Sequence, residues 1–115
     1  MNERDLIFLK HINESIGKID NFIYGISIDK FKKDEKTQYS IIRALEIIGE
    51  AIKNLSDETT LKYSNVPWKE YAGQRDILIH HYFGIDIEKV WRVIKEELPN
   101  LKKDIQDIIK KEKKK

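Results

Sequence analysis

The residues best suited to chemistry lie together between Arg75 and Tyr82, in the string RDILIHHY. An arginine, two adjacent histidines and a tyrosine can bind a phosphodiester and move a proton beside it. Successive residues of an α-helix are turned by about 100°, so Arg75 falls within the broad apolar face of the predicted helix. A permanently charged guanidinium on such a face predicts a carboxylate, an anion or a second subunit opposite it.

The side chains of this string suit different tasks at a phosphate group. Arg75 can bind two phosphate oxygens at once through its planar guanidinium. An unperturbed imidazole titrates at about pH 6.5, so His80 can accept and release a proton near neutral pH. His81 points away from His80 and is expected to be more exposed. Arg75 and His80 lie about 140° apart around a helix, so they converge only near a helix end or across two subunits.

Two carboxylates on the preceding helix could support this string. Glu46 and Glu50 lie on one side of the segment RALEIIGEAIKNL, one helical turn apart. They could form a solvated ion-pair face with Arg43 of the same helix. Alternatively, one of them could meet Arg75 across a cleft and orient its guanidinium. The sequence leaves both interpretations open.

Apolar residues recur at three- and four-residue spacing, which predicts amphipathic helices that must position these side chains. Three long helices are predicted over about residues 3–24, 34–55 and 67–83, the last of which carries the RDILIHHY string. Gly84 is expected to end that helix as a C-cap residue. Pro67 stands where a first-turn proline is favourable.

Shorter elements complete the predicted bundle. Ser27 and Asp86 are expected to cap a short helical turn and a fourth helix, respectively. Residues 57–66 are expected to form an irregular link with one helical turn. Pro99 is expected to kink or restart the chain before a last helix over 101–109. The predicted fold is therefore an all-α, up-and-down bundle of four to five helices.

Composition restricts the class of protein. The chain has 115 residues, a length that suits one domain, expected over 1–109. Its net charge is +2, and much of the basic excess lies in a tail over 110–115. It contains no cysteine, which excludes disulfides and thiolate metal sites, and no metal or cofactor motif is found. No apolar stretch approaches the roughly 20 residues that span a bilayer. We therefore expect a cytoplasmic protein without a membrane anchor, metal or cofactor.

The strings PWKEYAGQRDILIHHYFGIDIEKVW, RALEIIGEAIKNL and LPNL together resemble the HepT-like branch of the HEPN superfamily. The resemblance covers nearly the whole chain. The family signature is an arginine, four residues, a histidine, one residue and a tyrosine, which Arg75, His80 and Tyr82 match. The arginine–histidine spacing alone is a weak signal, but the flanking PW, HxYFG and tryptophan elements make it specific.

This resemblance implies a helical homodimer in which the motif helices of two subunits line a shared cleft. It implies a metal-independent ribonuclease, the toxin of a toxin–antitoxin pair, with RNA as its substrate. The implied partner is an MNT-type nucleotidyltransferase antitoxin that transfers AMP from ATP to the motif tyrosine, here Tyr82. Many HEPN proteins carry asparagine or another polar residue directly after the arginine. Asp76 stands there in this chain, where it could orient Arg75 or His80 while adding negative charge.

Two other functions fit the same residues. The chain could be a non-catalytic subunit that binds a nucleotide or serves as the companion of a nucleotidyltransferase. The motif could also form a buried polar network at a dimer interface without any ligand.

Overall fold

The computed structural model describes residues 1–73 and 86–114. Those residues form helices joined by short turns, without any strand, which confirms the predicted all-α class. The helices in chain order are α1 (Glu3–Ile23), α2 (Ile28–Lys33), α3 (Glu35–Lys53), α4 (Asp57–Lys62), α6 (Ile87–Arg92), the π-helical segment η1 (Val93–Glu97) and α7 (Leu98–Lys113).

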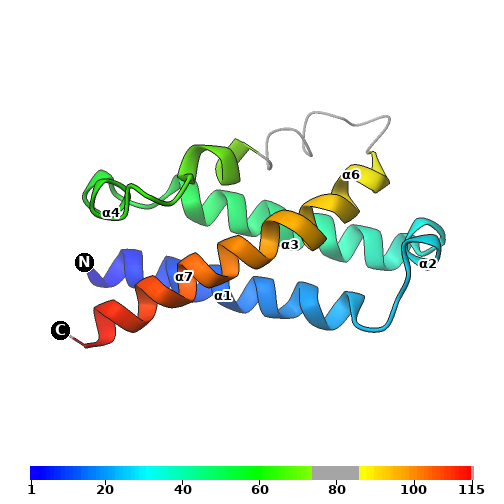
Figure 1. Ribbon diagram of the computed structural model, residues 1–115, viewed down its shortest axis with the longest axis horizontal. Coiled ribbons are helices and arrows are strands. Elements are labelled where there is room, and N and C mark those ends of the chain that lie inside the picture. The colour runs from blue at the N-terminus through cyan, green and yellow to red at the C-terminus, as the bar shows by residue number, and fades with distance from the viewer. Residues whose placement is uncertain (74–85, 115) are drawn as a thin grey trace.

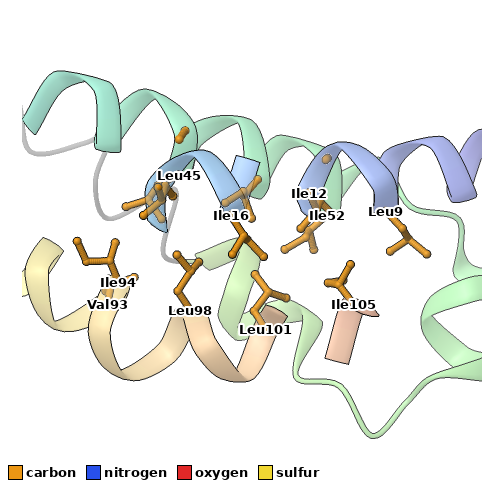
Figure 2. Packing of buried hydrophobic residues seen from close by; sticks show 14 of the residues in the cluster. Leu9, Ile12, Ile16, Leu45, Ile52, Val93, Ile94, Leu98, Leu101 and Ile105 are labelled. Atoms are coloured by element: carbon orange, nitrogen blue, oxygen red, sulfur yellow. The ribbon is translucent and has the colours of Figure 1, made fainter. Parts of the chain in front are cut away.

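Helices α1 and α3 run antiparallel, and α7 packs across them (Figure 1). The apolar stripe of each helix explains this arrangement, because residues three or four apart share the face that the neighbouring helix covers. Figure 2 shows side chains from all three helices meeting in one core. Its fully or almost fully buried members include Leu9, Ile12, Ile16, Ile48, Ile52, Leu101 and Ile105.

Polar side chains begin these helices at the predicted positions. The side chain of Ser27 accepts a hydrogen bond from the backbone N–H of Lys30, at the start of α2. Asp34 accepts from Thr37 at the start of α3, and Asp86 accepts from Lys89 at the start of α6. Each bond satisfies one of the backbone donors that a helix start leaves without an intrahelical acceptor.

The chain does not break at Pro99. Helix α6 continues through η1 into α7, and Pro99 lies in the first turn of α7. A proline nitrogen cannot donate to the carbonyl four residues earlier, so the hydrogen-bond ladder changes before it. The N–H of Leu98 accordingly bonds to the carbonyl of Val93, five residues back. Helix α7 then extends to Lys113, which makes the first residues of the predicted tail helical.

A buried carboxylate at the start of α1 holds the link after α3. Asp5 is fully buried and accepts hydrogen bonds from the hydroxyls of Ser56 and Thr59, each at 2.5 Å. The backbone N–H of Ser56 also donates to this carboxylate at 3.3 Å. These bonds fix the beginning of α4, the helical turn expected within residues 57–66. This role of Asp5 was not predicted from the sequence.

Candidate functional site

The RDILIHHY string lies outside the residues that the structure describes. The predictions for its side chains, and for the helix end that follows it, therefore remain predictions; they concern Arg75, Asp76, His80, His81, Tyr82 and Gly84. The structure does describe the start of the helix that leads into the string, the start of α6 after it, and the neighbouring face of α3.

The segment that enters the string is anchored in the core. A helix begins at Trp68, directly after Pro67, as predicted. The Trp68 side chain is buried, and its indole N–H donates to the backbone carbonyl of Tyr63 at 3.0 Å. The indole thus ties the first turn of this helix to the end of the α4 segment. We call the helix that begins at Trp68 the motif helix, because it leads toward the RDILIHHY string.

Tyr71 ties the same helix to α7. Its hydroxyl lies 3.5 Å from a carboxylate oxygen of Asp104. Burial, followed by the nearby carboxylates of Asp104, Glu97 and Glu70, raises the pKa of Tyr71 to about 12. The phenol therefore keeps its proton at physiological pH and acts as a hydrogen-bond donor. Trp68 and Tyr71 together fix the direction in which the chain enters the RDILIHHY string.

A hollow of about 540 Å³ lies between the end of α3 and the start of the motif helix. Lys53 and Lys69 line it together with Asp57 and Glu70, so its charge is mixed rather than uniformly basic. This hollow was not predicted from the sequence, because its walls come from separate segments of the chain.

The two predicted supporting carboxylates lie on the opposite edge of α3. Glu46 accepts a long hydrogen bond from the guanidinium of Arg43, at 3.4 Å, which is one of the two pairings that the sequence left open for Arg43. Glu46 and Glu50 line a hollow of about 470 Å³ between α1 and α3. Their contact with Arg75 stays a prediction. The structure shows an ion-pair face that also borders a cavity.

His11 of α1 is exposed and lines the same hollow, as do Phe8 and Asn54. No local pattern in the sequence connects these residues with Glu46. Only the pairing of α1 with α3 brings them together.

Two further observations concern the described residues. They contain no group of three or more histidine, cysteine, aspartate or glutamate side chains placed to hold a metal ion. None of their helices has the length and apolar character needed to cross a bilayer.

Comparison with known proteins places these features in a family. The model of a family described as "Ribonuclease HepT-like" matches residues 12–108. A Methanocaldococcus jannaschii protein named as a putative RNase is 48% identical over 103 residues, covering 90% of this chain and 85% of that protein. A Caldanaerobacter subterraneus subsp. tengcongensis protein with the same kind of name is 45% identical over 106 residues, covering 92% of this chain and 95% of that protein.

A third relative, from Thermococcus cleftensis, is named "Probable ribonuclease HepT". It is 45% identical over 95 residues, which are 83% of this chain and 86% of that protein. No solved structure matches this chain significantly.

Proposed function

The chain belongs to the HepT-like ribonuclease family, and from this premise we propose that it cleaves RNA without a metal ion through Arg75 and His80. The family match over residues 12–108 carries this proposal, because it contains the whole RDILIHHY string and the helices that border it. The described residues support it by anchoring the start of the motif helix at Trp68 and Tyr71.

The proposed reaction is an intramolecular transfer at phosphorus. His80 accepts the proton of a ribose 2′-OH, and the 2′-oxygen attacks the adjacent phosphorus. Arg75 binds the two non-bridging oxygens, on which negative charge grows as the fifth bond forms. The bond from phosphorus to the 5′-oxygen breaks, and that oxygen takes up a proton. The products are a 2′,3′-cyclic phosphate and a free 5′-hydroxyl.

A single subunit supplies one acid–base group, whereas the reaction needs a proton acceptor and a proton donor. A two-fold symmetric dimer with both motif helices in one cleft would supply the second imidazole. Asp76 could hold Arg75 or His80 in the required orientation. Glu46 and Glu50 are proposed to assist from α3, while His81 is a less direct candidate.

We further propose that Tyr82 is the regulatory residue. Transfer of AMP from ATP by an MNT-type nucleotidyltransferase would join the phenolic oxygen to the α-phosphorus and release pyrophosphate. The new phosphodiester brings a negative charge and a nucleoside beside Arg75 and His80. The added charge and the nucleoside would both block RNA binding. The modified toxin would therefore be inactive, whether it stays bound to its antitoxin or is released.

The first experiment measures the intact mass of this chain after co-expression with an MNT-type nucleotidyltransferase encoded beside it. We expect a gain of one or more AMP units, which Tyr82→Phe abolishes. An unchanged mass with an active transferase would contradict the AMP switch.

The second experiment measures cleavage of labelled single-stranded RNA in excess EDTA. Arg75→Ala and His80→Ala should each reduce the rate at least about a hundredfold, while the circular dichroism spectrum stays that of the parent. Nucleotide binding without any cleavage by the parent would instead favour a companion subunit of the transferase.

A further inference from the structure

Two tyrosines attach the segment that enters the RDILIHHY string to α7. The hydroxyl of Tyr63 donates to the carboxylate of Glu112, near the end of α7. The hydroxyl of Tyr71 lies 3.5 Å from a carboxylate oxygen of Asp104, earlier on α7. The tyrosines are eight residues apart, and the carboxylates are eight apart in the opposite order. The segment therefore runs antiparallel to α7 and is attached to it at two points. We name Tyr63, Tyr71, Asp104 and Glu112 the α7 brace.

Both phenols of the brace are hydrogen-bond donors in a largely buried setting. Tyr63 is 8% exposed, and the side chain of Glu112 is 5% exposed. Burial, followed by the hydrogen bond to Glu112, raises the pKa of Tyr63. Burial and the charge of Asp104 raise the pKa of Tyr71 in the same direction. Each phenol thus keeps its proton at neutral pH and can donate it to a carboxylate oxygen.

The buried carboxylate of Glu112 has charged partners besides Tyr63. The ammonium group of Lys62 lies 3.0 Å from one of its oxygens, and the N-terminal ammonium group lies 3.3 Å from the other. These cations offset the cost of removing the carboxylate from water. Loss of the Tyr63 hydroxyl would therefore not leave Glu112 as an unpaired buried charge, so Tyr63→Phe is a mild substitution.

Trp68 connects the first attachment point to the motif helix. Its indole N–H donates to the carbonyl of Tyr63 at 3.0 Å, and the backbone N–H of Val66 donates to the same carbonyl at 3.1 Å. Tyr63 thereby holds the beginning of the motif helix, and Tyr71 holds it about one turn later. A single attachment would let the helix pivot, whereas two attachments fix both its position and its direction.

Apolar packing alone does not supply this precision. The hydrophobic effect is non-directional, so the contacts of Trp68 and Tyr71 with the core hold the helix without fixing its rotation about its own axis. A hydrogen bond requires a defined geometry of donor and acceptor. A buried ion pair also often contributes no more stability than apolar residues of similar volume. These properties favour a positioning role for the brace over a role in stability alone.

We propose that the α7 brace positions the motif helix for RNA cleavage, and that its four side chains act through this helix without touching the substrate. The helix leads toward Arg75 and His80, and a misplacement of about 1 Å in reacting groups can lower a rate by about a hundredfold. The expected effect on the rate rests on the proposed function. The hold of the brace on the helix does not, and it can be measured without any cleavage.

The first test measures kcat and KM for cleavage of a labelled single-stranded RNA in excess EDTA. Tyr63→Phe/Tyr71→Phe keeps both rings and removes both hydroxyls. It should lower kcat by about tenfold or more, while KM changes by less than about twofold because no substrate contact is lost. Tyr39→Phe removes a hydroxyl from a ring that is 72% exposed and is the matched control, which should cleave like the parent.

Conservative substitutions on α7 test whether the acceptor oxygens matter. Asp104→Asn and Glu112→Gln each keep a carbonyl oxygen that can accept from the phenol, so both variants should cleave like the parent. Asp104→Ala removes the acceptor and should lower kcat as the loss of the Tyr71 hydroxyl does. Asp107→Ala, at an exposed position of α7, is the control for substitution on this helix.

The second test measures hydrogen exchange of the backbone amides of residues 71–73, which report local opening of the motif helix. The variant Tyr63→Phe/Tyr71→Phe should exchange these amides about tenfold faster, since each lost hydrogen bond is worth on the order of a tenfold change in an equilibrium constant. The amides of α1 and α3 should exchange at the parent rate, because the brace does not include those helices.

The two tests separate the brace from the nuclease. Parent-like kcat in the double tyrosine variant of an active nuclease, or unchanged exchange at residues 71–73, would overturn the inference. A loss of kcat with faster exchange throughout α1 and α3 would overturn it as well, because the tyrosines would then only stabilise the fold. Faster exchange confined to the motif helix, in a protein that cleaves no RNA, would support the brace and contradict the nuclease.

Discussion

Asp5 shows how one buried side chain can control a distant part of the chain. Its carboxylate has no cation in hydrogen-bond range among the described residues and is held by neutral donors of Ser56 and Thr59. Burial opposes its ionisation, but the bonds from Ser56 and Thr59 outweigh burial and lower the pKa of Asp5 below its usual value of 3.8. The ionised form is therefore the one that stabilises the fold.

We predict that Asp5→Ala lowers the free energy of unfolding by about 2–4 kcal/mol, because it leaves buried hydroxyl and backbone donors without their acceptor. Urea denaturation followed by circular dichroism measures this loss. Asp29→Asn, in the first turn of α2 and exposed, is the control and should change stability by less than about 0.5 kcal/mol.

The lowered pKa of Asp5 also predicts the pH dependence of stability. A carboxyl whose folded-state pKa lies below its unfolded value stabilises the fold fully above the unfolded pKa. This contribution declines as the pH falls from about 4 through the folded-state pKa. Asp5→Asn should flatten the plot of unfolding free energy against pH in that acidic range. A plot for Asp5→Asn parallel to that of the parent would show that Asp5 does not cause this pH dependence of stability.

At the scale of elements, α1 carries a glycine that its structure does not require. Gly17 is half-buried within α1, and a methyl group added to it would meet no atom within 4 Å. Gly25, which follows α1, has a φ of +73° that side chains other than glycine rarely adopt.

We predict opposite effects of alanine at these two positions. Gly17→Ala should raise the free energy of unfolding by about 0.5–1 kcal/mol, since alanine loses less backbone entropy in a helix. Gly25→Ala should lower it by about 1 kcal/mol, because alanine is strained at positive φ. Thermal or urea denaturation of the two variants beside the parent checks both signs. Destabilisation by Gly17→Ala would show that α1 packs against something at this position.

The helix starts illustrate how much local sequence decides. Ser27 and Asp86 were predicted as caps from residue type and position, and each accepts the expected backbone hydrogen bond. Pro99 was predicted to kink the chain or restart it with a new helix. The π-helical turn of Val93–Glu97 keeps the helix continuous instead, because α7 is held on the core by Leu98, Leu101 and Ile105.

At the scale of the whole molecule, the proposed reaction depends on a dimer. We expect light scattering to give twice the chain mass of 13.7 kDa at micromolar concentration, because the second acid–base group must come from another subunit. The ribonuclease rate per subunit should fall when the protein is diluted below the dissociation constant of the dimer. A monomer with full activity would rule out the shared cleft.

The sequence by itself determined most of the described helices, the caps at Ser27 and Asp86, and the family. Helix periodicity and capping depend on residues three or four apart, and the family motif lies within one short string, so these features can be read locally. The buried residues of α1, α3 and α7 also follow from that periodicity.

Tertiary structure alone decided which distant residues meet. Asp5 and Ser56 are 51 residues apart, and Tyr71 and Asp104 are 33 apart, so no local pattern could pair them. The hollow with His11 and Glu46 exists because α1 and α3 pack side by side in antiparallel directions. That packing is set by the summed burial of many apolar side chains, which no single motif encodes.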